Sequence, residues 1–321
     1  MKRTTASIMI FALLFTVLFL TGCGKRHTGL QPQSGGRPYE VLLVGDSTED
    51  VLTALQADAD ALPQSEPSFD VSSIPTRRYN SSVWLARAIV IVNIDRDLYS
   101  TTRLRYEKNL HAAPQMVVYV NTPSRQTLHR DMTTLGGQLR QLLTRFEMNS
   151  EMEQLTYTGN PKAEHLVSQI TGTNIKVPAD MASSKKGKNF VWLSNNAATG
   201  MQNLCVYTLP LRPLTQSWLI AMRDSVMMVN IPGERQGMYM QTVVPSVEAA
   251  ATRENGKRRV IMRGLWEMKG DAMGGPFVAH VMVDSAHNRL VVAEAFVYAP
   301  ESLKRNKIRQ TEAALYTLKT P

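Results

Sequence analysis

The chain is poor in cysteine, because only Cys23 and Cys205 occur among its 321 residues. This excludes a small fold held by several disulfides. The longest hydrophobic run, residues 8–20, has 13 residues, whereas a membrane-spanning helix needs about 20. With 43% hydrophobic residues and ordinary glycine and proline counts, the sequence also excludes a disordered or repetitive chain. Its length indicates a globular protein of two domains.

Motifs for metals and common cofactors are also missing. The chain has no His-Glu-x-x-His, no paired Cys-x-x-Cys, no Gly-x-Gly-x-x-Gly and no P-loop. Its six histidines, at positions 27, 111, 129, 165, 280 and 287, do not pair at the spacing of ligands on one helix face. The sequence therefore predicts neither a metal nor a cofactor.

The N-terminus has the pattern of an export signal. Lys2 and Arg3 precede the apolar run of residues 8–20, which has the length of a signal-peptide core. Leu20-Thr21-Gly22-Cys23 then resembles the bacterial lipobox. The resemblance implies cleavage after residue 22 and lipidation of Cys23, which anchors the protein in a membrane. The alternative is an ordinary secretory signal that a chance cysteine follows.

The residues after Cys23 bear on location and partners. Gly24 stands where an aspartate would favour the inner membrane, so we expect the periplasmic face of the outer membrane. Residues 23–38 are polar and form a flexible tether. Without residues 1–22 the remaining 299 residues keep a net charge of +7. This charge favours an envelope protein, an anionic glycan or an anionic lipid as partner. The alternative is that the charge serves solubility alone. Export from the cytoplasm excludes nucleic acid as a partner.

The mature chain mixes strand and helix patterns without strict alternation. Apolar runs predict strands at residues 39–44, 88–94, 115–120, 277–283 and 290–298, the last two as a hairpin. Apolar periodicity predicts helices after residue 47, over the stretch that contains Gly136 and Gly137, over residues 215–229 and from residue 301. These elements indicate an α+β fold with mixed or antiparallel sheets in two similar-sized halves, residues 39–155 and 156–321.

One set of motifs is typical of an ester hydrolase. Gly45-Asp46-Ser47 follows the first strand and resembles the first block of the GDS-type (SGNH) hydrolases, and Asp284-Ser285-Ala286-His287 fits their last block. The resemblance implies attack by Ser47, with His287 as base and Asp284 orienting it. The alternatives are local: Ser47 and Asp50 form a helix capping box, and residues 284–288 form a hairpin turn.

Two further features are ambiguous between binding and structure. Asp271, Gly274 and Gly275 near Trp266 form either a ligand-binding loop or the tight turn before the next strand. The basic clusters at residues 185–188, 257–259 and 304–307 are read as solvated surface, with an anion site as the alternative. Cys205 lies in an apparent strand and is expected to be a buried small hydrophobe.

Five short stretches resemble a family of Bacteroidetes lipoproteins of unknown function, DUF4837. They are residues 36–41, 62–67, 274–277, 295–300 and 304–306. The resemblance extends over nearly the whole mature chain and implies an envelope lipoprotein without an assigned activity. We therefore expect a lipid-anchored envelope protein that binds or assembles, rather than an enzyme.

Overall fold

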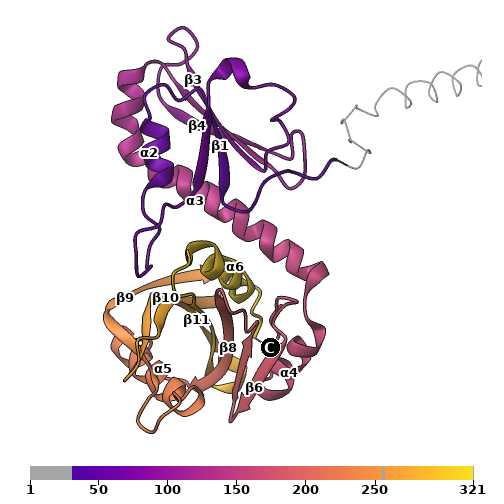
Figure 1. Ribbon diagram of the computed structural model, residues 1–321, viewed down its shortest axis with the longest axis vertical. Coiled ribbons are helices and arrows are strands. Elements are labelled where there is room, and N and C mark those ends of the chain that lie inside the picture. Colours follow the sequence, from indigo (N-terminus) through magenta and orange to yellow (C-terminus); the bar gives the residue numbers. More distant parts are fainter. Residues whose placement is uncertain (1–30, 255–256, 321) are drawn as a thin grey trace, which may run out of the picture. The chain divides into compact units, whose positions relative to one another are not determined.

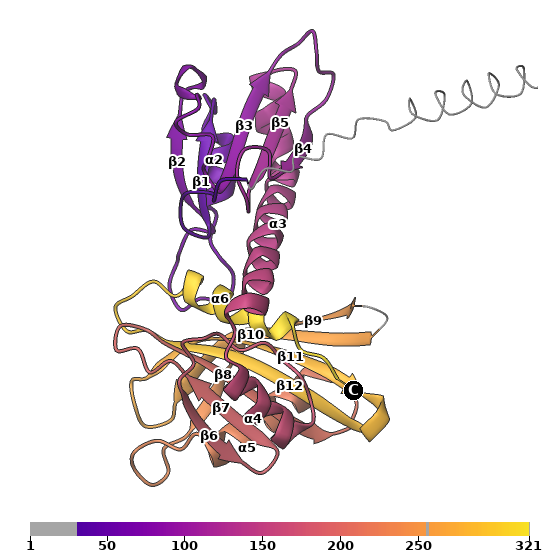
Figure 2. The same cartoon turned by 90° about the vertical axis from the view of Figure 1, so that its right-hand side faces the viewer.

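The computed structural model describes residues 31–254 and 257–320. Cys23 and the predicted signal peptide lie outside these residues. Two sheets, of five and seven strands, combine with helices in an α+β fold, as the sequence predicted (Figures 1 and 2). None of the described helices is both long and apolar enough to cross a membrane.

The first sheet is mixed, with strand order β2-β1-β3-β5-β4. β2, β1, β3 and β5 run parallel, and β4 is antiparallel at the edge. The strands are β1 (Glu40–Val44), β2 (Asp70–Ile74), β3 (Ala88–Ile94), β4 (Arg103–Lys108) and β5 (Met116–Thr122). The sequence predicted mixed or antiparallel sheets, and this sheet is mixed, but β2 and β4 were not predicted because these short polar strands carry little apolar signal.

Two helices cover one face of this sheet. They are α2 (Asp50–Gln56) and α3 (Arg125–Thr158), whose 34 residues extend for about 51 Å. β3 shows why the face is buried: Val90 and Val92 join the core under the helices, and Ile89 and Ile91 join a smaller cluster on the opposite face. The predicted domain boundary after residue 155 falls in the last turn of α3.

The second sheet has the order β6-β7-β8-β12-β11-β10-β9 and is antiparallel throughout. Its strands are β6 (Ser183–Gly187), β7 (Phe190–Ser194), β8 (Met201–Pro210), β9 (Met240–Glu254), β10 (Lys257–Met268), β11 (Gly274–Asp284) and β12 (Arg289–Tyr298). β11 and β12 are the predicted hairpin, connected by the short helix η2 (Ser285–His287). A second short helix, η1 (Thr76–Arg78), follows β2.

Helices cover both faces of the second sheet. α5 (Gln216–Asn230) packs on one face, and α4 (Pro161–Thr171) and α6 (Arg305–Tyr316) pack on the other. β8 serves both cores, because Cys205 and Tyr207 point to the α5 side whereas Leu204 and Val206 point to the α4 and α6 side. Cys205 is fully buried, as expected.

An ion pair lies inside the core on the α5 side. Arg223 of α5 donates to Glu294 of β12 at 2.8 Å and to the Thr242 hydroxyl at 2.8 Å, and its guanidinium lies over the Phe277 ring. Burial raises the pKa of Glu294, although the charge of Arg223 opposes this shift. Both side chains are at most 1% exposed, so each charged group depends on the other to compensate its charge.

Local sequence signals explain several helix ends. Asn160 accepts a hydrogen bond from the Ala163 amide at the start of α4, with Pro161 at the first helical position. The prediction that Ser47 and Asp50 form a capping box was wrong. Asp46 instead accepts the amides of Val51 and Leu52 at 3.0 and 2.9 Å.

Candidate functional site

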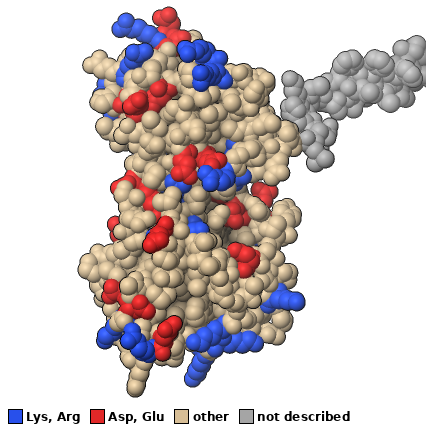
Figure 3. Space-filling view, viewed as in Figure 1, with Lys and Arg blue, Asp and Glu red and all other residues tan. Residues whose placement is uncertain are grey.

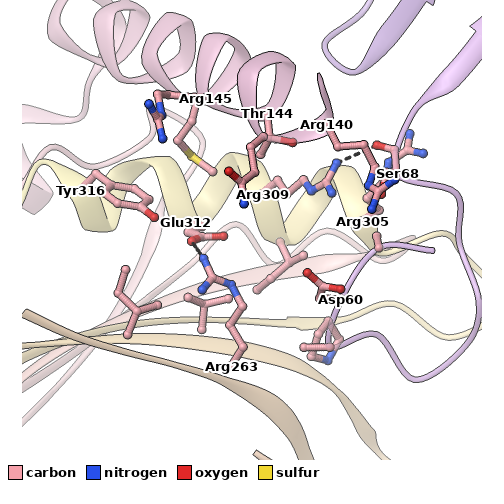
Figure 4. Close-up of a pocket in the computed structure, with 18 of the residues that line it drawn as sticks. Asp60, Ser68, Arg140, Thr144, Arg145, Arg263, Arg305, Arg309, Glu312 and Tyr316 are labelled. Carbon is pink, nitrogen blue, oxygen red and sulfur yellow. Dashed lines mark hydrogen bonds and ion pairs between the residues drawn. The ribbon is translucent and has the colours of Figure 1, made fainter. Parts of the chain in front are cut away.

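A cavity of about 800 Å³ lies where α3, α6 and the edge of the second sheet meet. Residues 58–62 and Ser68, from the connection between α2 and β2, complete its wall. Figure 4 shows Thr144 and Arg145 on α3 at one side, Arg263 on the sheet at the other, and Arg309, Glu312 and Tyr316 of α6 between them. The volume is in the range of ligand-binding pockets in proteins.

The lining is rich in arginine. Among the described residues that line the cavity, seven are arginines and three are acids (Asp58, Asp60 and Glu312). The arginines are Arg140, Arg145, Arg253, Arg259, Arg263, Arg305 and Arg309. On the face of the molecule drawn in Figure 3, by contrast, basic and acidic side chains are interspersed. The lining of the cavity therefore has more basic than acidic side chains, unlike the mixture on this face.

The N-terminus of α6 is fixed by a residue that is far away in the sequence. Glu66 is 1% exposed and accepts the backbone amides of Lys304 and Arg305 at 2.8 and 2.9 Å. The Arg305 guanidinium in turn donates to Asp70 at 2.7 Å and to the Pro67 carbonyl. These bonds satisfy free amides of the helix end and hold the connecting segment against α6.

Arg309 lies one turn further along α6. It donates to the Ser68 carbonyl at 2.8 Å, and its guanidinium lies 4.8 Å from the centre of the Tyr39 ring and 5.9 Å from that of Phe69. These contacts fix the position of the guanidinium beside the cavity. A guanidinium has five N–H donors, so one hydrogen bond leaves further donors for a ligand.

Glu312 is the acid at the centre of the site. Arg263 donates to its carboxylate, and His280 Nε2 lies 3.8 Å from the same oxygen. Arg259 Nη1 is 3.2 Å from His280 Nδ1. Because a guanidinium only donates, Nδ1 must be the acceptor, and the imidazole proton resides on Nε2, toward Glu312.

Burial sets the charge of this pair. It lowers the pKa of His280, with Arg259 and Arg263 acting in the same direction, so the ring is neutral near neutral pH. Burial would raise the pKa of Glu312, but the nearby His280 imidazole and the charge of Arg263 outweigh it and lower the pKa. The cluster therefore keeps one internal carboxylate as counter-ion to Arg263.

The remaining arginines have more free donors. Arg140 donates to the Ala54 carbonyl at 2.6 Å, whereas the exposed side chain of Arg145 makes no hydrogen bond or ion pair with any described residue. Arginine donors in a fixed fork suit phosphate and carboxylate groups. The arrangement can therefore recognise a negatively charged ligand.

Asp284 and His287, two of the three residues proposed for ester hydrolysis, lie together. Asp284 accepts hydrogen bonds from Arg289 and pairs with His287 at 2.9 Å. Ser47 follows the carboxyl end of β1, and within the described ranges no hydrogen bond connects it to His287. Asp70, at the amino end of this sheet, pairs with Arg305 of α6. β1 begins beside Asp70, and its five residues extend for about 16 Å away from this end, toward Ser47. This geometry gives the ester-hydrolase hypothesis no support.

The ambiguous loop near Trp266 is structural. The Trp266 side chain is 2% exposed and packs in the core, and Asp271 is exposed in the turn. Gly274 and Gly275 begin β11, where a Cβ on Gly275 would lie 2.0 Å from the Val297 carbonyl oxygen. The glycine is required because the β12 backbone approaches so closely. None of these four residues lines the arginine-rich cavity.

The expectation that the basic clusters are solvated surface was wrong for Arg259, Lys304 and Arg305, whereas Arg258 is exposed. Arg259 is 2% exposed, and Lys304 and Arg305 are 6% and 4% exposed. Arg259 and Arg305 belong to the cavity, where they meet arginines that the sequence analysis had not singled out. Single arginines in α3, β9 and β10 carry no local signal for such a site. In the portions of the chain that are described, no three His, Cys, Asp or Glu side chains cluster as metal ligands would.

Two family models match the chain. Residues 160–317 match a domain of unknown function (DUF4837), and residues 34–156 match a second domain of unknown function (DUF8532). The motifs at residues 36–41 and 62–67 thus fall in the second of these domains, whereas we had assigned nearly the whole mature chain to DUF4837. The motifs at 62–67 and 304–306 nevertheless meet, through Glu66 and the start of α6.

Comparison with other proteins adds little. No curated protein matches the chain. The Saccharomyces cerevisiae Ran-binding protein Mog1p is 11% identical, with 46% of this chain and 89% of that one covered, at a TM-score of 0.30. Cyanobacterial PsbP from Synechocystis sp. PCC 6803 is 12% identical, with 47% and 88% covered, at a TM-score of 0.27. These scores are too low for an inference about function.

Proposed function

We propose that the chain, which belongs to the DUF4837 family through residues 160–317, is a lipid-anchored, non-enzymatic protein of the bacterial cell envelope. In this proposal it binds an anionic ligand in the arginine-rich cavity. The observation that carries the binding proposal is the excess of seven arginines over three acids around about 800 Å³. Arginines gathered around one cavity repel one another unless counter-charges compensate them, and a bound anion would add to the compensation that Glu312 and Asp70 provide.

The lipid anchor and the envelope location rest on the sequence. The n-region, the 13-residue apolar run and Leu20-Thr21-Gly22-Cys23 support lipidation of Cys23, and Gly24 supports the outer membrane. Labelling of cells with radioactive palmitate is expected to mark the wild type but not Cys23→Ala. A Cys23→Ala protein that stays in the membrane fraction would contradict the anchor.

Calorimetric titration with inorganic pyrophosphate tests the binding proposal. We expect binding that weakens steeply between about 0.05 M and about 0.5 M sodium chloride, because salt screens the attraction between arginines and anion. Arg145→Gln should lower the affinity about fivefold, the effect of losing one partly exposed charge-assisted hydrogen bond.

Arg125→Gln is the matched control for Arg145→Gln. Arg125 is exposed at the start of the same helix, outside the cavity, so its replacement changes the net charge equally. Equal losses of affinity in the two variants would assign binding to general charge and refute the cavity.

A further inference from the structure

The cavity is not polar throughout. Met148 and Met152 of α3, Ile308 of α6, and Ile261 and Val278 of the sheet line it together with the arginines. Met148, Ile261 and Ile308 are less than 10% exposed, so the apolar part belongs to the buried wall. An apolar part of a ligand could therefore pack against this side of the cavity.

The two kinds of side chain are separated along α3. The cavity-lining residues of this helix lie between Gly137 and Met152, with Arg140 and Arg145 before Met148 and Met152, and with Asn149 between the two methionines. At about 1.5 Å per residue, Arg140 and Met152 are about 18 Å apart along the helix axis. The basic residues therefore precede the apolar ones along one wall.

α6 forms the facing wall. Its lining residues begin with Arg305, Ile308 and Arg309, and Tyr316 lies at the end of the helix. Figure 4 shows Arg140 beside Arg305 and Arg309 at one end of the cavity, with Tyr316 at the other. Arginines of both helices therefore lie at one end of the cavity, and at the other end the Arg259 guanidinium lies 5.5 Å from the centre of the Tyr316 ring.

We infer that the ligand is an amphiphile with an anionic head and a single hydrocarbon chain. The inference rests on the proposed function and specifies its ligand class. The head, a phosphate or a carboxylate, meets the guanidinium groups of Arg140 and Arg309. The chain lies against Met148 and Met152, whose flexible thioether side chains adapt to hydrocarbon.

Titration with butyl, hexyl and octyl phosphate, each below its micelle concentration, tests this inference. Each methylene that becomes fully buried should raise the affinity about fourfold. We expect the affinity to rise at least tenfold from butyl to octyl phosphate. Octyltrimethylammonium, which has the same hydrocarbon chain and a cationic head, should bind at least tenfold more weakly than octyl phosphate.

Substitutions of methionine test the contribution of the ligand's hydrocarbon chain separately from that of its anionic head. Met152→Gln should weaken octyl phosphate at least threefold and leave inorganic phosphate unchanged. Met228→Gln is the matched control, because Met228 is 44% exposed on α5 and lies outside the cavity. Equal effects of the two variants would overturn the inference.

The probes also distinguish the two levels of the proposal. If butyl and octyl phosphate bind equally tightly and inorganic phosphate or pyrophosphate also binds, the amphiphile is refuted and the anion site stands. If octyltrimethylammonium binds as tightly as octyl phosphate, the anionic head is refuted. If no anionic probe binds, the proposed function itself fails.

Discussion

Replacement of Glu66 tests whether the contact between residues 62–67 and α6 stabilises the protein. Glu66 is buried and uses its carboxylate to accept the amides of Lys304 and Arg305. Each charge-assisted hydrogen bond contributes about 1.5–3 kcal/mol. Glu66→Gln keeps one accepting oxygen but turns an NH₂ group toward the other amide, so we expect a loss of about 2–4 kcal/mol. Glu66→Ala removes both acceptors and should cost about 3–5 kcal/mol.

Urea unfolding followed by tryptophan fluorescence gives the free energies of unfolding. Glu49→Gln is the control, because Glu49 occupies the N-cap position of α2 without a side-chain hydrogen bond there. Its cost should stay within about 0.5 kcal/mol, as for other exposed sites. If Glu66→Gln is as stable as this control, or if Glu66→Ala costs no more than Glu66→Gln, the capping contact does not have the role assigned to it.

Three further predictions concern stability. Arg223→Leu should cost about 3–5 kcal/mol, because it leaves Glu294 buried and unpaired, and Arg223→Leu/Glu294→Leu should recover most of this loss in urea unfolding. Gly275→Ala should cost more than about 3 kcal/mol, since its Cβ would meet the Val297 oxygen. Gly137→Ala should instead stabilise α3 by about 0.5–1 kcal/mol, because no atom lies within 4 Å of the added Cβ. Thermal unfolding of the two variants measures this difference. The pKa of His280, which faces Arg259 and Arg263 of β10 and Glu312 and Tyr316 of α6, is lower in the folded than in the unfolded state. Folding therefore opposes its protonation, and stability is lost as the pH falls from about 7 through the unfolded pKa toward the folded one. His280→Phe should show a smaller loss between about pH 7 and pH 5, and parallel curves for the two proteins would refute this assignment.

Local patterns in the sequence predicted much of the secondary structure. The run at residues 88–94 specified β3, and its continuous apolar character correctly indicated a strand with both faces buried. The runs of the β11–β12 hairpin and the Asn160-Pro161 start of α4 were equally informative. β2 and β4 were missed because polar strands resemble loops when their neighbours are unknown.

The candidate cavity could not be predicted in this way. Its arginines come from α3, β9, β10 and α6, between residues 140 and 309, and no short motif connects them. The basic cluster at residues 304–307 was visible, but its burial depends on Glu66, which lies 238 residues from Lys304. The Gly45-Asp46-Ser47 motif shows the opposite difficulty, because the helix cap made by Asp46 and the pair of Asp284 and His287 resemble parts of a triad when each is considered separately.

By itself, the sequence determined the α+β class, most helices and strands, and the family of the C-terminal half. These properties follow from periodicity, caps and motifs that extend over a few residues. Only the tertiary structure decided that residues 62–67 cap α6 and that seven arginines surround one cavity. The physical reason is that the burial of a charge depends on which distant groups satisfy it, and the fold alone brings those groups together.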